Sequence, residues 1–314
     1  MPSLDALASS SHDVIAVLTR PDAPSGRGRC VAASPVKVRA LELGLEVLTP
    51  SRPADPQFQA RLRELAPDAC PVVAYGGLIP PSLLTIPTHG WINLHFSLLP
   101  AWRGAAPVQH AIIAGDEVTG ATTFLLAQGM DTGPILGMMT ETITSGDTAA
   151  DLLRRLAGAG AGLLVATLDA LAAGELHAVA QSVQGVSLAP KISVQDARIV
   201  WTTPALAVDR HIRGCTPRPG AWTTFRGARL KIHPVTVILD DLAPDVGDAT
   251  APGAWVHDIL GPGQIGATKL SVRVGTASGA VLLSAVQPSG KRAMDAADWA
   301  RGVRLQPFEK FSDE

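Results

Sequence analysis

The sequence predicts an α/β protein with two parts, a doubly wound and mainly parallel sheet followed by a small C-terminal β-barrel that is OB-like. Through Gly174, short apolar runs alternate with segments of helical period, which is typical of βα units. Beyond it, helical periodicity weakens and short β-like runs are separated by Pro and Gly. With 314 residues, 46% of them hydrophobic, the chain can build two cores. We therefore place a first domain at 1–174, a linker at 175–194 and a second domain at 195–314.

The first domain opens on a helix-like piece, residues 2–8, before its first strand. Ser34 followed by Pro35 predicts the start of a helix that Gly44 ends, since Ser caps a helix and Pro suits its first position. A short extended segment begins at Val47. The other predicted strands and helices, in chain order, are the strand 14–19, the helix 55–65, the strands 69–75 and 91–96, the helix 105–114, the strands 121–126 and 135–143, and the helix 148–173.

The second domain is predicted to hold one helix, Pro204 to Ile212, with Thr203 as its cap. The predicted strands are 223–225, 230–233, 235–239, 272–274 and 280–283. Short strands at this spacing, separated by turn residues, are typical of a small barrel.

Charge and cysteine usage narrow the class of protein. The net charge of −2 predicts no polyanionic partner by itself. The stretch 210–239 contains no acidic residue and could be either a solvated face or a track for phosphates. Its basic residues are Arg210, Arg213, Arg218, Arg226, Arg229 and Lys231. A cytosolic protein is favoured by three features of the sequence. Its three cysteines are dispersed and lack metal-site spacing, there is no long uncharged apolar run, and there is no signal-peptide pattern.

Asn93, His95 and Asp131 are the candidate reactive groups. Asn93 and His95 alternate on one predicted strand, so their side chains share a face at the end where α/β sheets place ligands. Asp131 lies between Gly129 and Gly133, which permit tight turns. A donor for an oxyanion, a proton carrier and a carboxylate are the groups that direct acyl transfer needs. Each residue alone could equally be a satisfied core group or a turn residue.

The pattern as a whole is more specific than its parts. Residues 93–107 read NLHFSLLPAWRGAAP, and residues 129–133 read GMDTG. These motifs resemble the folate-dependent formyltransferases, and within them the methionyl-tRNA formyltransferases. The loop 20–29 (RPDAPSGRGR), the segment 189–201 and the tail segment 287–294 (QPSGKRAM) resemble the same family, so the similarity covers essentially the whole chain.

The resemblance implies transfer of the formyl group of 10-formyltetrahydrofolate to the α-amino group of methionyl initiator tRNA. It implies Asn93, His95 and Asp131 as the catalytic trio, with Asp131 raising the pKa of a protonated His95. The residues matching the folate segment are Ser97, Leu98, Leu99 and Pro100. Arg27 matches a basic residue of the loop that approaches the acceptor end. For tRNA binding we add Arg29, Arg213, Arg218 and Lys231. We expect no metal, because a formyl group on an aryl amine is already activated, and we expect a monomer.

The sequence departs from the family pattern in two places. Ala127 stands where an acidic residue is expected four positions before Asp131, which bears on how the pterin is recognised. The family's opening strand and Gly-Thr-Pro turn are also not in this sequence. Such a strand would lie in the middle of the sheet, so we expect a gap between the strands at Val14 and Ala69. We interpret this as a start assigned too far downstream, or else a truncation.

Three alternatives share part of the pattern. A formyltransferase acting on a nucleotide sugar or purine precursor, or a formyltetrahydrofolate hydrolase, would share the trio. Such proteins should lack the 26–29 loop together with the C-terminal barrel. A non-catalytic RNA-binding relative would not need the trio.

Overall fold

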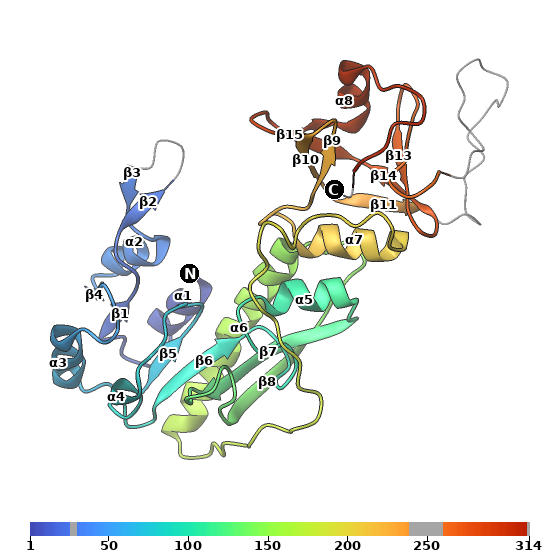
Figure 1. The fold of residues 1–314 in the computed structure, drawn as a ribbon. Helices are drawn as coiled ribbons and strands as arrows, with labels where there is room; N and C mark the ends of the chain where they lie inside the picture. Colours follow the sequence, from blue (N-terminus) through green and yellow to red (C-terminus); the bar gives the residue numbers. More distant parts are fainter. Residues whose placement is uncertain (26–29, 239–259, 313–314) are drawn as a thin grey trace. The chain divides into compact units, whose positions relative to one another are not determined.

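The computed structural model describes residues 1–25, 30–238 and 260–312 (Figure 1). The chain forms two compact units. The first comprises residues 1–107, 118–142 and 153–190, and the second comprises residues 108–117, 143–152 and 191–314. Each unit is described by itself below.

The first unit opens with α1 (Pro2–Ala8), β1 (Ala16–Leu18), the hairpin β2 (Ala23–Ser25) and β3 (Cys30–Ala32), α2 (Pro35–Glu42), β4 (Glu46–Leu48) and α3 (Pro56–Leu65). The predicted cap of α2 is confirmed, because the Lys37 amide donates to the Ser34 hydroxyl at 3.1 Å. Asp55 caps α3 in the same way, at 2.9 Å from the Gln57 amide. β1 and β4 pair in parallel.

The rest of the first unit surrounds a four-stranded sheet of order β5-β6-β7-β8. Its strands are β5 (Cys70–Val72), β6 (Trp91–His95), β7 (Val118–Leu125) and β8 (Ile135–Thr142), with helix α4 (Pro81–Leu84) and α6 (Ala149–Ala172) from residue 153 onward. The helix α5 (Pro107–Ala114) and the first turn of α6 belong to the second unit. β5 and β6 are parallel, whereas β7 and β8 add antiparallel pairs. The prediction of a mainly parallel sheet is therefore wrong for β7 and β8. The chain turns back between β7 and β8 without a crossover helix, so these two strands must run in opposite directions.

The strands at the start of the chain are not joined to this sheet. Among the described residues, β1 pairs only with β4 and β5 pairs only with β6, so one edge of each strand stays open. This is the gap that the sequence led us to expect between Val14 and Ala69.

β6 carries different side chains on its two faces. Ile92 and Leu94 are buried, and Ile92 packs with Leu164 and Leu168 of α6. On the opposite face Trp91 packs with residues of α3 and α4, and its indole donates to the Leu83 carbonyl at 2.7 Å. The layers on both sides fix the strand, and its carboxyl end carries His95.

α6 is long and apolar enough to cross a membrane by length and composition. A core helix passes the same test, and here Leu152, Leu156, Leu164 and Leu168 form the buried stripe that its periodicity predicts.

The second unit contains α7 (Ala205–Gly214), β9 (Trp222–Phe225), β10 (Ala228–Ile232), β11 (Val235–Ile238), β12 (Ile265–Ala267), β13 (Val272–Gly275), β14 (Ala280–Leu283), β15 (Ala285–Pro288), β16 (Met294–Asp295) and α8 (Ala296–Val303). The strands form two antiparallel sheets, β16-β15-β10-β9 and β11-β14-β13-β12. Over the described part of the unit, no pairing closes them into one barrel. Their shared core includes Trp201, whose ring stacks on Phe311 at 5.4 Å. The predicted Thr203 cap is wrong, since its hydroxyl donates to the Val200 carbonyl.

Candidate functional site

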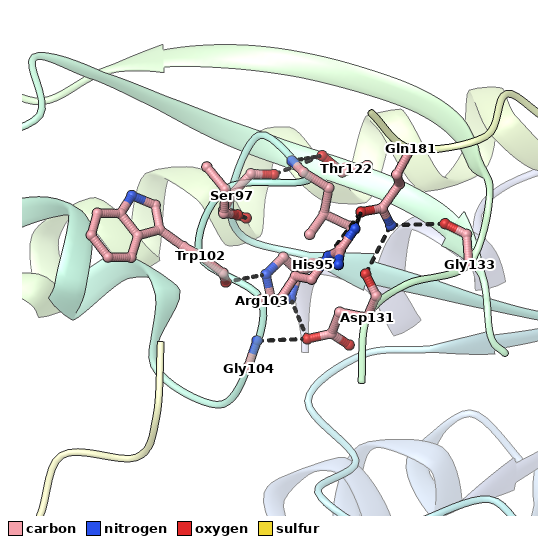
Figure 2. A network of polar contacts seen from close by, with 11 residues as sticks. His95, Ser97, Trp102, Arg103, Gly104, Thr122, Asp131, Gly133 and Gln181 are labelled. Carbon is pink, nitrogen blue, oxygen red and sulfur yellow. Dashed lines mark hydrogen bonds and ion pairs between the residues drawn. The ribbon is translucent and has the colours of Figure 1, made fainter. Parts of the chain in front are cut away.

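The candidate site lies at the carboxyl end of β6, where His95 is held between two partners (Figure 2). Its ring Nε2 lies 2.9 Å from the Trp102 carbonyl oxygen. Because a carbonyl only accepts, Nε2 carries the proton and donates it. Nδ1 then faces the Asp131 carboxylate, 3.7 Å from Oδ2. The ring is 7% exposed and meets Phe124 edge-on. His95 thus presents one committed nitrogen and one available nitrogen.

Asp131 is fixed by its loop and by a backbone donor. The Gly104 amide donates to Asp131 Oδ2 at 2.8 Å. Asp131 itself adopts a left-handed conformation with φ of 50°, which Asp tolerates better than most residues. Gly104 has φ of 129°, and a Cβ there would lie 2.6 Å from the Ala189 carbonyl oxygen, so only glycine fits. The carboxylate is therefore aimed at His95 by local backbone geometry.

The electrostatics of His95 correct one expectation. Burial lowers the pKa of His95, and this outweighs the Asp131 charge and the Trp102 carbonyl, which both raise that pKa. The family resemblance implied that Asp131 holds His95 protonated. The proximity is present, but the ring is too buried for that charge to dominate, so the free site holds a neutral imidazole at pH 7.

Asn93 lies two residues before His95 on the same strand, so the two side chains share a face of the sheet. It is half-buried, and the described residues offer no hydrogen-bond partner to its side chain. Its amide is free to donate to a bound molecule.

The predicted folate segment contributes less side-chain chemistry than its sequence suggests. Ser97 is fully buried, and its hydroxyl donates to the Ala101 carbonyl at 2.6 Å. Its own carbonyl accepts from Thr122, whose hydroxyl also accepts from the Leu99 amide. Leu99 is buried as well, so the accessible side chains of the segment are Leu98 and Pro100.

A network that the sequence analysis missed surrounds the site, and its central residue is Gln181. The Gln181 amide nitrogen donates to the Asp131 and Gly133 carbonyls, both at 2.8 Å. Its oxygen accepts from the Arg103 guanidinium at 3.0 and 2.6 Å. Gln181 lies in the predicted linker, where nothing in the local pattern marks it. Its Gln type in a Pro- and Gly-punctuated segment is typical of a solvated loop.

The predicted tRNA residues fall into three groups. Arg27 and Arg29 lie outside the described residues. Arg218 is exposed and Lys231 is half-buried, with its ammonium donating to the Pro219 carbonyl at 3.0 Å. Arg213 is 8% exposed, and it is paired with Asp209 at 2.8 Å and bonded to the Asp147 carbonyl. The expectation for Arg213 is therefore wrong, because a phosphate cannot reach a guanidinium committed inside the second unit.

Arg229 is the exposed cation that the sequence analysis counted in its basic stretch without selecting it. Its guanidinium lies over the Trp222 ring at 4.1 Å, and the described residues provide it with no anionic partner. Arg226 differs, because Glu309 binds it through two hydrogen bonds of 2.7 and 2.8 Å. Within residues 1–25, 30–238 and 260–312, no group of His, Cys, Asp and Glu could hold a metal ion.

Comparisons with known proteins give one consistent result. Residues 2–168 match the family described as formyl transferase, and residues 191–304 match the formyl transferase C-terminal domain. The chain is 59% identical to the methionyl-tRNA formyltransferase of Streptomyces coelicolor, over all of this chain and 96% of that protein. It is 57% identical to the methionyl-tRNA formyltransferase of Thermobifida fusca over the same shares.

Solved structures of lower identity share the fold. The sugar 3N-formyl transferase WlaRD, solved with dTDP and 5-N-formyl-THF, matches with a TM-score of 0.63 at 15% identity, over 93% of this chain and 94% of that one. HypX from Aquifex aeolicus in complex with tetrahydrofolic acid matches with a TM-score of 0.59 at 16% identity, over 88% of this chain and 48% of that one.

Proposed function

Because the chain belongs to the methionyl-tRNA formyltransferase family, we propose that it transfers the formyl group of 10-formyltetrahydrofolate to the α-amino group of methionyl initiator tRNA. The product is N-formylmethionyl-tRNA, which serves translation initiation. The observation that supports this chemistry most directly is the His95 ring, which Trp102 holds so that its other nitrogen faces Asp131.

The three groups take complementary roles. Attack of the methionyl amine on the formyl carbon places negative charge on the formyl oxygen, and the free Asn93 amide donates to it. The amine proton passes to Nδ1 of His95, and Asp131 stabilises the imidazolium that forms. The same proton then passes to N10 of the leaving tetrahydrofolate, so His95 ends the cycle neutral. A pKa lowered by burial suits this role, because His95 must first accept a proton.

The folate co-substrate contacts Leu98, Pro100 and the backbone of residues 97–100, because the Ser97 hydroxyl and the Leu99 side chain are occupied internally. Ala127 is exposed and supplies no carboxylate to the pterin. Two proteins of the same fold that were solved with tetrahydrofolate derivatives support a folate as the co-substrate.

The tRNA side uses basic side chains. Arg27, Arg29, Arg218, Lys231 and Arg229 neutralise phosphates of the acceptor arm, and Arg229 replaces Arg213 in that set. The protein acts in the cytoplasm as a monomer. We keep the domains at 1–174 and 195–314 with the linker 175–194 between them, and we keep the OB-like barrel as the proposed form of the β-rich second domain.

One assay separates the alternatives. The protein is incubated with 10-formyltetrahydrofolate and methionyl initiator tRNA, and formylmethionine is measured. A hydrolase would consume the folate without this product. A nucleotide-sugar formyltransferase would consume the folate only after a nucleotide amino sugar is added, and a binding relative would retain the tRNA without turnover. Arg27→Ala should reduce activity on methionyl-tRNA far more than it changes folate binding, and equal loss of both would contradict the assignment.

A further inference from the structure

We propose that Gln181 is a positioning residue for formyl transfer, which clamps the Asp131 loop to the Arg103–Gly104 segment so that the Asp131 carboxylate stays aimed at His95. This inference rests on the proposed function. It concerns a residue of the segment between the two matched family regions, residues 2–168 and 191–304.

All hydrogen-bonding capacity of the Gln181 side chain is directed at two loops (Figure 2). Its two N–H groups donate to two backbone carbonyls of one loop, those of Asp131 and Gly133. Its oxygen accepts twice from Arg103, at the start of the other loop. An amide is the one side chain of this size that offers two donors and an acceptor together.

The two loops are the same two that the Asp131 carboxylate joins. Gly104 follows Arg103 directly and donates its amide to Asp131 Oδ2 at 2.8 Å. The Gln181 side chain is therefore a second link between the two loops, beside the Gly104–Asp131 hydrogen bond. If the clamp opens, the Gly104–Asp131 bond and the 3.7 Å approach of Asp131 to His95 lose their support together.

The segment around Gln181 is itself anchored, so the clamp is rigid. Val179 pairs with Ile135 through bonds of 2.8 and 2.7 Å, just beyond the Asp131 loop. The Ser187 carbonyl accepts from the Arg103 amide at 2.9 Å, and the Arg103 carbonyl accepts from the Ala189 amide at 2.7 Å. Residues 179–189 thus lie along both loops, with Gln181 between the two backbone anchors.

The backbone of the Asp131 loop is strained, so the hydrogen bonds of Gln181 are needed to hold the loop in position. Asp131 is held at a positive φ, which is strained for a non-glycine residue. Met130, beside it, is 69% exposed and provides little packing. A loop that is strained and thinly packed depends on its hydrogen bonds for its position.

Two variants separate the clamp from the rest of Gln181. Gln181→Glu keeps the size of the side chain and its acceptors for Arg103, and replaces both N–H donors by an oxygen that repels the Asp131 and Gly133 carbonyls. Gln181→Ala removes every contact. Gln184→Glu is the matched control, since Gln184 is an exposed residue of the same segment with no described side-chain partner.

Steady-state kinetics on full-length protein give the first readout. We expect both Gln181 variants to lose on the order of 10- to 100-fold in kcat, because small misplacements of reacting groups cost that much, with KM for folate and tRNA within about threefold of wild type. Gln184→Glu should match wild type. Wild-type kcat in Gln181→Glu, or a loss confined to KM, would overturn the proposal.

A second readout does not depend on turnover. The ring protons of His95 are titrated by NMR in wild type and in Gln181→Glu. Asp131 raises the pKa of His95, so a displaced Asp131 should move that titration to lower pH. An unchanged titration would overturn the proposal even if Gln181→Ala fails to fold. If wild type forms no formylmethionyl product, the proposed function fails, while this titration still decides the role of Gln181.

Discussion

The end of β6 and the basic stretch of the second unit use polar side chains in opposite ways. Around His95, each group has a partner of defined geometry: Trp102 holds the ring, Gly104 holds Asp131, and Gln181 holds the loops. In the basic stretch, the buried Arg213 is committed to Asp209, while Arg229 extends into solvent over Trp222. Catalytic groups must be placed within a fraction of an ångström of the reacting carbon, whereas a basic side chain can adjust its position to reach a phosphate. The contrast separates groups that are positioned in advance from groups that adapt to their ligand.

The largest expected effect is at His95. His95→Asn should lower kcat by about 10³-fold, because proton transfer by a positioned side chain contributes on the order of 10² to 10⁴. Folate affinity, measured by calorimetry, should stay within a few fold. A variant that retains more than a tenth of wild-type kcat would show that the proton takes another route.

The next effect is on folding and concerns Arg213. Arg213→Met should lower the free energy of unfolding by about 3 kcal/mol, since it leaves the Asp209 carboxylate buried and unpaired. The activity of the remaining folded protein should not change. Urea denaturation measures the loss, and the double variant Arg213→Met with Asp209→Leu should recover most of it. A stable Arg213→Met protein with a raised KM for tRNA would indicate that Arg213 does contact a tRNA phosphate.

A smaller effect is expected at Arg229. Arg229→Gln should raise KM for methionyl-tRNA roughly 3- to 10-fold and reduce by about one the slope of log KM against log salt, because one phosphate contact is lost. Unfolding should hardly change. Arg226→Gln serves as the control, because Glu309 already neutralises Arg226. Equal effects of the two substitutions would argue for net charge rather than for a specific contact.

The smallest effect is a pH dependence that both regions share. Burial lowers the pKa of His95 in the first unit and of His211 in the second. The unfolded chain therefore binds these protons first as pH falls below about 6.5, and stability decreases from there until the folded-state pKa is passed. Each group contributes at most about 1.4 kcal/mol per pH unit. His211→Gln should make the free energy of unfolding, measured by urea titration, depend less steeply on pH between about 6.5 and 5. An unchanged slope would contradict the attribution of this pH dependence to His211.

The sequence predicted well those features that local pattern determines. Alternation on β6 placed Asn93 and His95 on one face, and glycines around Asp131 predicted its turn. The cap of α2 follows from Ser34 in the same local way, whereas the cap that Asp55 gives α3 was not predicted.

Features that depend on residues far apart in the chain could not be predicted from the sequence. The count of basic residues could not tell the buried Arg213 from the exposed Arg229, because exposure is set by residues far along the chain. The pKa of His95 depends on how closely the layers pack around it, which no motif records. Gln181 acts across 50 residues on Asp131, and its own neighbours in sequence give no sign of that.

The anchoring of residues 179–189 on the first unit has a practical consequence for dissecting the molecule. A fragment that stops at the last turn of α6 would leave Arg103 and the Asp131 loop without Val179, Gln181 and Ala189. It could retain the sheet and every motif residue and still turn over poorly. An autonomous formyl-transferring fragment should extend to about Pro190, where the first unit ends. For the same reason, a protease nick between Gln181 and Ala189 should lower the activity of the enzyme.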